Sequence, residues 1–125
     1  MSGLRDFLTT ILPTTGWFCA SYGTIKNNKL QRVKHDFSQE IAVIEATLVK
    51  ENSKGRDVYF TPNSFTEERR STETASHSKS IYLDLDCGEG KMYATQAEGL
   101  KALTTFLTQT QLPKPTFIIN SVSGL

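Results

Sequence analysis

One alternating segment, Ser80–Gly88, constrains this chain more than any other part of its sequence. The apolar members of the alternation are Ile81, Leu83 and Leu85. Apolar residues at every second position are typical of a half-buried β-strand. On such a strand Asp84 and Asp86 point to the same face, roughly 6–7 Å apart along the chain. We therefore expect two carboxylates side by side, next to a glycine turn.

Two ionised carboxylates held this close repel each other unless a cation lies between them. Carboxylate oxygens favour hard ions, so Asp84 and Asp86 predict a site for Mg²⁺ or Mn²⁺, ions that commonly carry nucleotide phosphates. The alternative is a solvated turn, because Asp, Asn and Gly also gather at strand ends. An Asp-x-Asp pair taken alone is more often such a turn, and only its neighbourhood favours a metal site.

The composition is that of one small domain with a modest core, since the chain has 125 residues. Its formal net charge of +1 gives no global field toward nucleic acid and leaves room for a local basic groove. Cys19 and Cys87 are expected to be reduced thiols of a cytoplasmic protein, and their spacing with the histidines matches no zinc motif. The apolar stretch Leu4–Leu12 is too short and too charged to span a membrane.

Local signals divide the chain into short helices and strands. The second helix has apolar residues at helical spacing and a cap at Asp36 or Ser38. The turn at Lys26–Lys29 carries local positive charge and is expected to be the tip of a hairpin. The expected elements are, in order, a helix at Leu4–Leu12, strands at Gly16–Tyr22 and Leu30–Lys34, a helix closed by Lys54–Gly55, a strand at Asp57–Phe60, a mobile loop at Asn63–Ser80, the Asp84/Asp86 strand, a turn at Gly88–Lys91, a helix opened by the capping box Thr95–Glu98 and ended before Pro113, and a strand at Pro115–Asn120.

The last strand, helix and strand predict a parallel pairing through a right-handed crossover. The carboxyl ends of both strands would then meet at one edge of the sheet, with Asp86 close to Ser121. The predicted fold class is α+β, a mixed β-sheet with flanking helices. We also expect four aromatic residues to lie in the core because of the phase of their elements. These residues are Trp17, Tyr59, Phe60 and Phe106.

Several segments, in this order and spacing, resemble a known family over nearly the whole chain. They are Leu12–Pro13, Gly16–Cys19, Val58–Phe65, Arg69–Arg70, Ile81–Gly88, Tyr93–Thr95, Glu98–Leu103, Leu112–Thr116 and Ile119–Ser121. The family is that of the primase-polymerases of the archaeo-eukaryotic primase superfamily, in the form found in phages, plasmids and mobile elements. The resemblance is to the N-terminal part of their catalytic domain.

The resemblance implies roles for particular residues. The family's first motif, an hDhD strand, falls on Leu83–Asp86 and makes Asp84 and Asp86 catalytic metal ligands for Mg²⁺ or Mn²⁺. The second motif, Ser-Gly-x-Gly-x-His, begins at Ser121 and has Val122 in place of its first glycine. Ser123 stands at its free position and Gly124 at its second glycine. Its histidine would follow Leu125, so residues 1–125 are expected to be a catalytic domain truncated within this motif, and inactive alone.

The implied function is that of a DNA primase and DNA polymerase. It transfers nucleotides from nucleoside triphosphates on a DNA template by a two-metal reaction, and a helicase domain often accompanies it. Contacts to the nucleotide's phosphates are expected from Ser121, Ser123, Gly124, Lys91, Arg69 and Arg70.

Two other functions remain open from the sequence. The chain is alternatively a non-catalytic module that binds nucleic acid or a partner and retains the first half of the fold. A different metal-dependent phosphotransfer enzyme, such as a nuclease or a glycosyltransferase, is supported by the Asp pair only. If the sheet continues past Leu125, the strand Thr116–Asn120 exposes an unpaired edge, and we then expect self-association.

Overall fold

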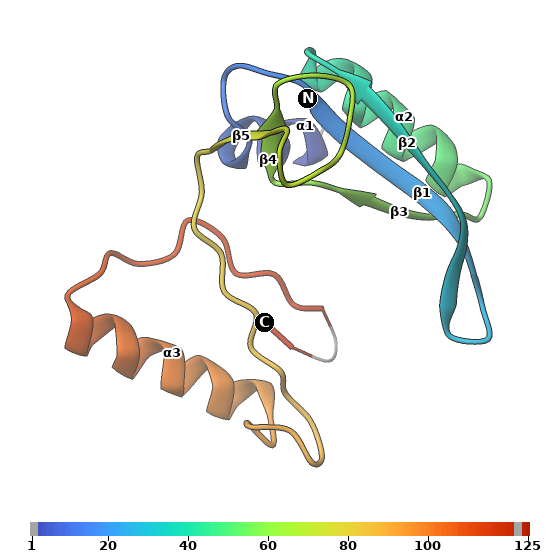
Figure 1. Cartoon of the computed structure of the whole chain (residues 1–125). Helices are drawn as coiled ribbons and strands as arrows, with labels where there is room; N and C mark the ends of the chain where they lie inside the picture. The colour runs from blue at the N-terminus through green and yellow to red at the C-terminus, as the bar shows by residue number, and fades with distance from the viewer. Residues whose placement is uncertain (1–2, 122–123) are drawn as a thin grey trace. The chain divides into compact units, whose positions relative to one another are not determined.

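The computed structural model describes residues 3–121 and 124–125, and these residues form an α+β fold (Figure 1). They contain three helices and two small antiparallel sheets. The predicted α+β class is confirmed. The chain divides into two compact units, Met1–Ile81 and Tyr82–Leu125, which are described in turn.

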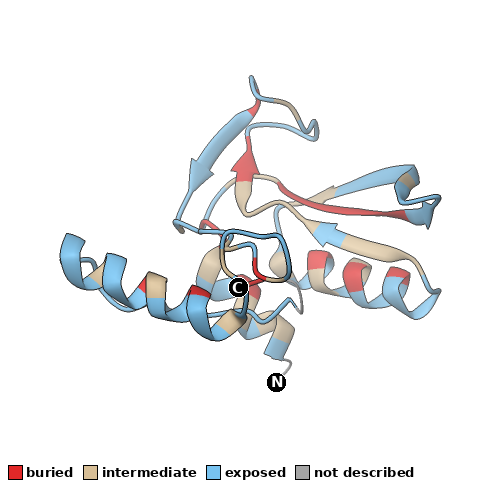
Figure 2. Cartoon of the chain, turned by 90° about the horizontal axis from the view of Figure 1, so that it is seen from below, coloured by how far each residue is buried: buried red, intermediate tan, exposed pale blue. Residues whose placement is uncertain are grey.

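The first unit is built on a three-stranded antiparallel sheet with the strand order β2-β1-β3. Its strands are β1 (Phe18–Lys26), β2 (Lys29–Ser38) and β3 (Asp57–Phe60), and its helices are α1 (Gly3–Ile11) and α2 (Ile41–Ser53). Alternate residues of β1 pack with the two helices. The buried core consists of Leu8, Leu12, Phe18, Ala20, Ile44 and Leu48. Figure 2 shows this burial along β1 and on one side of α2.

The predicted hairpin tip is confirmed, because Lys26 pairs with Lys29 across a two-residue turn. Asn27 and Asn28 have φ angles of 53° and 60°. Positive φ at both central residues is the requirement of a type I′ turn, and asparagine accepts this conformation better than most residues.

The ends of α1 and α2 agree with those predicted from the sequence, except for the N-cap of α2. The helix α1 ends before Pro13 and α2 ends at Lys54–Gly55, both as predicted. The predicted cap of α2 at Asp36 or Ser38 is wrong: the N-cap is Glu40, without a side-chain hydrogen bond. Asp36 and Ser38 instead belong to β2, where pairing with β1 extends the strand beyond the predicted Lys34.

The predicted loop at Asn63–Ser80 is wrong in part, since it contains the short antiparallel strands β4 (Asn63–Phe65) and β5 (Ala75–Ser78). The buried Thr74 closes the turn between them, because its hydroxyl donates to the Arg69 carbonyl at 2.6 Å. Ser and Thr hydroxyls commonly close turns in this way. The Ser/Thr-rich composition therefore marks a folded turn.

The second unit contains α3 (Gln96–Thr110), which begins with the predicted capping box. The Thr95 hydroxyl accepts from the Glu98 N–H at 3.2 Å, and the Glu98 carboxylate accepts from the Ala94 N–H at 3.0 Å. The helix ends at Gln111, whose φ is 58°, before Pro113 as predicted.

The two strands predicted around α3 are wrong. Ser80–Gly88 and Pro115–Asn120 lie outside the named strands, and Asp86 makes an isolated antiparallel bridge to Gly124. The predicted parallel pairing through a crossover is therefore also wrong. A period of two describes a strand only where a neighbour occupies the hydrogen-bonding edge. The expected strand at Thr116–Asn120 does not form either, so it provides no sheet edge. Self-association stays a prediction that this strand no longer supports.

The predicted burial of aromatic residues is wrong at two of four positions. Trp17 and Phe60 are half-buried, whereas Tyr59 is 46% and Phe106 is 45% exposed. Tyr59 pairs with Ser21 and so projects from the side of the sheet opposite the helices. The described buried residues of α3, Gly99 and Leu103, lie on one side of the helix, and Phe106 is not among them.

None of the helices in the described ranges has both the length and the apolar character that crossing a bilayer requires.

Candidate functional site

Asp84 and Asp86 lie on an extended, exposed segment of the second unit. Asp86 forms the antiparallel bridge to Gly124, and reciprocal backbone hydrogen bonds join Leu85 and Leu125 at 3.0 and 3.1 Å. Residues widely separated in the sequence are thus brought side by side. The structure places the segment with the two carboxylates against Gly124 and Leu125.

Gly124 is required at this bridge by lack of space. A Cβ atom there would lie 2.4 Å from the Leu85 carbonyl oxygen, which is well inside van der Waals contact. The Ser121 N–H donates to the Gly124 carbonyl at 3.1 Å. Ser123, predicted to contact phosphate, and Val122 lie outside the described residues. The sequence therefore identified both sides of the bridge, and the structure shows what joins them.

Lys91 lies on the predicted turn after Asp86, and its side chain is exposed. The turn is closed by the hydrogen bond from the Lys91 N–H to the Gly88 carbonyl at 3.1 Å. Gly88 and Gly90 have φ angles of 134° and 77°, which favour glycine. A short turn thus connects this ammonium group to the Asp86 bridge.

Arg69 and Arg70 belong to the first unit, and the structure shows their contacts there. Arg69 makes ion pairs with Glu67 at 3.7 Å and with Glu73 at 3.9 Å. Arg70 donates from Nε to the Thr61 hydroxyl at 3.3 Å. Both arginines therefore have local partners within the first unit.

The carboxylates of Asp84 and Asp86 suit a hard cation. In the described part of the chain, no ion pair or side-chain hydrogen bond occupies either group. No set of three or more His, Cys, Asp or Glu side chains gathers for a metal within the same ranges. Two carboxylates still fit Mg²⁺, which keeps several waters and is often held by one or two carboxylates plus substrate phosphates.

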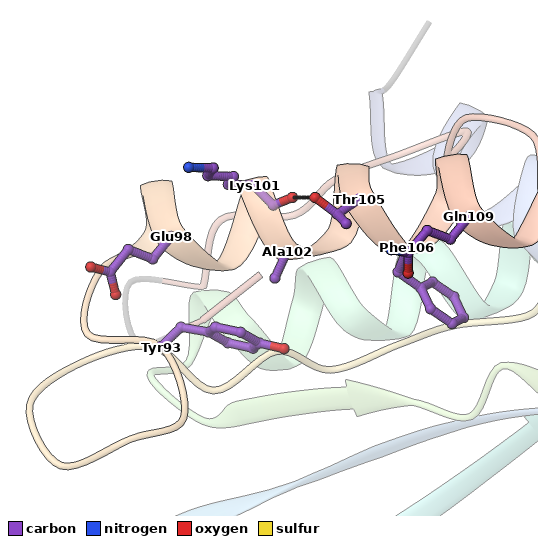
Figure 3. A pocket seen from close by; sticks show the side chains of 7 residues that line it. All are labelled: Tyr93, Glu98, Lys101, Ala102, Thr105, Phe106 and Gln109. Atoms are coloured by element: carbon purple, nitrogen blue, oxygen red, sulfur yellow. Dashed lines mark hydrogen bonds between the residues drawn. The ribbon is translucent and has the colours of Figure 1, made fainter.

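A shallow hollow on α3 was not predicted. It measures about 400 Å³ and is lined by Tyr93, Glu98, Lys101, Ala102, Thr105, Phe106 and Gln109. Figure 3 shows Tyr93, Ala102 and Phe106 on one side of the helix. None of the predicted site residues that the structure describes lines it. Phe106, which the sequence places in the core, instead lines this hollow.

A polar group on β1 and β2 was also missed. The hydroxyl of Ser21 and Nδ1 of His35 lie 2.6 Å apart, and the Cys19 sulfur lies 3.6 Å from the same hydroxyl. Ser21 and His35 are partners in the register of the hairpin, which the sequence alone did not establish. Burial raises the pKa of the Cys19 thiol, so this sulfur stays protonated and is a poor nucleophile and metal ligand.

Comparison of this chain with protein families, with characterised proteins and with solved structures finds no match. A function for this chain must therefore be argued from the motifs of its sequence and from the geometry above.

Proposed function

We propose that this chain carries the metal-binding and phosphate-binding segments of a primase-polymerase. The reaction is nucleotidyl transfer from nucleoside triphosphates on a DNA template, with Mg²⁺ or Mn²⁺. The observation that supports it is the bridge between Asp86 and Gly124. It joins the segment that resembles the family's metal-binding motif to the segment that resembles its triphosphate-binding motif, although 37 residues lie between Asp86 and Gly124 in the sequence.

The roles follow from the chemistry of the side chains. Asp84 and Asp86 hold the divalent cation, and water and substrate phosphates complete its ligands. When bound, such a cation lowers the pKa of an attacking hydroxyl and neutralises charge on the departing pyrophosphate. Lys91 donates to a phosphate oxygen from its exposed turn. Ser121 contributes its hydroxyl, because its N–H already donates to the Gly124 carbonyl.

A non-catalytic DNA-binding module is the second candidate. It is favoured by a group of exposed basic side chains on the β1–β2 hairpin, which needs no metal to attract a polyanion. The two candidates differ in whether the carboxylates of Asp84 and Asp86 matter.

The deciding experiment measures Mn²⁺ binding to the full chain by titration calorimetry, with and without a nucleoside triphosphate. We expect a Mn²⁺ site that the nucleotide strengthens and that Asp84→Asn/Asp86→Asn abolishes. The matched control is Asp6→Asn/Glu68→Gln, which removes the same charge from exposed positions and should bind like the wild type.

Equal Mn²⁺ binding by the wild type and by Asp84→Asn/Asp86→Asn contradicts the proposal. Any nucleotide incorporation on a primed DNA template that the wild type supports should also fall in this variant, by roughly a thousandfold. This magnitude corresponds to the several kcal/mol that metal ions contribute to such transition states.

A further inference from the structure

We propose that the β1–β2 hairpin binds the phosphate backbone of duplex DNA. We call residues 24–35 the basic hairpin, because they contain four Lys or Arg residues and no Asp or Glu. The four are Lys26, Lys29, Arg32 and Lys34, and all are exposed. Pairing with β3 ends at Gly23, so the tip extends past the three-stranded part of the sheet (Figure 1). The positive charge is therefore concentrated on a protruding ribbon.

Two of the four charges of the basic hairpin oppose each other across the strands. Lys26 and Lys29 are direct partners in the register, and like charges in that position destabilise a strand pair. Within the described residues, none of the four cations has an ion-pair partner. The nearby Asp57 accepts a hydrogen bond from the Ile25 N–H at 3.3 Å. A bound polyanion would relieve this repulsion.

A β-bulge puts three lysines on one face of the ribbon. Tyr22 pairs with Lys34 and Lys26 pairs with Lys29, so four steps on β1 correspond to five on β2. Without the extra residue, Lys29 and Lys34 would point to opposite faces, because side chains alternate along a strand. With it, both share the face of Lys26. The Ile25–Leu30 pair lies on the other face.

The bulge requires unfavourable backbone geometry at Arg32 and a glycine at position 23. Arg32 has a φ of 53°, a conformation that non-glycine residues adopt rarely. A Cβ at the opposing Gly23 would lie 2.8 Å from the Gln31 carbonyl oxygen, so glycine is needed there. Strained positions of this kind concentrate at functional sites. The bulge thus separates the cationic face from the apolar pair and exposes Arg32 beside it.

The chemistry of the basic hairpin favours duplex DNA over other polyanions. Asn27, Asn28 and Gln31 stand between the cations, and such side chains donate to phosphate and sugar oxygens. No Phe, Tyr or Trp occurs in residues 24–35, whereas unpaired bases and membrane interfaces are typically bound through such side chains. A two-stranded ribbon is also an element that the major groove admits. Only the choice of DNA over RNA in this inference depends on the proposed function.

The test is fluorescence anisotropy of a short labelled DNA duplex with the full chain, in EDTA, over a series of salt concentrations. The variant is Lys29→Gln/Lys34→Gln. We expect its affinity at low salt to fall about tenfold or more and its salt slope to fall by about two, one for each phosphate contact. The matched control Lys50→Gln/Lys114→Gln and the charge-preserving Lys29→Arg/Lys34→Arg should bind within about twofold of the wild type.

Three results would overturn the inference: no binding of duplex by the wild type at low salt, unchanged binding by Lys29→Gln/Lys34→Gln, or binding to phosphatidylserine vesicles in place of DNA. The assay contains no metal or nucleotide. Asp84→Asn/Asp86→Asn should therefore bind duplex normally, so failure here is distinguishable from failure of the proposed reaction. Far-ultraviolet circular dichroism checks that each variant is folded.

Discussion

Glu51 shows how one buried carboxylate is held by two cations. Its side chain is 7% exposed and makes ion pairs with Arg56 at 2.6 Å and Lys54 at 3.4 Å. Burial alone would raise its pKa, but the two cations outweigh burial and lower the pKa below the ordinary value of 4.5. The Arg56 guanidinium also lies 5.7 Å from the centre of the Tyr22 ring. A single acid thus connects α2 with the chain that leads into β3.

We predict that Glu51→Gln lowers the urea midpoint of unfolding at pH 7 and leaves it nearly unchanged near pH 3. The folded pKa is lowered, so the contribution of Glu51 is complete above about pH 4.5 and is lost as the pH falls through the folded value. Urea titrations at both pH values measure this. Glu68→Gln, at an exposed position, is the control, and an equal loss at both pH values would contradict the ionic explanation.

The second prediction at the scale of single residues concerns Gly124. Gly124→Ala should weaken the bridge to Asp86, because the added Cβ meets the Leu85 carbonyl oxygen. Overpacking of this kind costs about 1–3 kcal/mol. Hydrogen exchange at the Leu85 amide should become correspondingly faster. Gly3→Ala, where an added Cβ meets nothing within 4 Å, should leave that exchange unchanged.

At the scale of elements, the hairpin and α3 behave as their local sequences predict, and the segments around α3 do not. The turn at Asn27–Asn28 needs only the left-handed conformation of two residues. The capping box needs only groups within five consecutive residues, Ala94–Glu98. The segment around Asp84 needs a neighbouring strand from elsewhere in the chain. Among the described residues of the second unit, its backbone makes reciprocal hydrogen bonds between Leu85 and Leu125. It also makes isolated bridges from Asp86 to Gly124 and from Cys87 to Tyr93, but no named strand.

We predict that Asn28→Val destabilises the first unit by about 1–2 kcal/mol, because a β-branched residue resists the left-handed conformation. Asn28→Gly should be neutral or stabilising, since glycine adopts positive φ without a steric cost. Thermal unfolding measures both changes. Equal stability of the valine and glycine variants would mean that the turn is not type I′ in solution.

At the scale of the whole molecule, the division into two units predicts where the chain is cleaved first. Ile81 is 97% exposed, Tyr82 65% and Leu83 57%, next to the boundary between the units. Proteases cut exposed extended segments before they cut paired strands or helices. The two units should therefore separate before either is degraded.

Limited digestion with chymotrypsin should cut first after Tyr82, and mass spectrometry of the fragments identifies the site. Tyr82→Ser should slow this first cut and leave later cuts in place. A first cut within β1 or α2 would instead show that the first unit opens more readily than the segment at the boundary.

The structural features that the sequence determined by itself are those that depend on a few neighbouring residues. They are the ends of α1 and α3 before Pro13 and Pro113, the hairpin tip and the capping box. The residues of the candidate site, Asp84, Asp86, Ser121 and Gly124, were selected from equally short motifs, and their role as a site stays a prediction. Each of these features depends on the conformation or chemistry of residues close in the chain.

The tertiary structure alone decided which of these residues meet. It paired Asp86 with Gly124 where a parallel sheet was expected, folded Asn63–Phe65 against Ala75–Ser78, and left Phe106 exposed. Strand pairing and burial depend on segments that are distant in the sequence, and a period of two is the same whether or not a partner strand is present. The register of β1 and β2, which aligns three lysines on one face, is likewise known only from the tertiary structure.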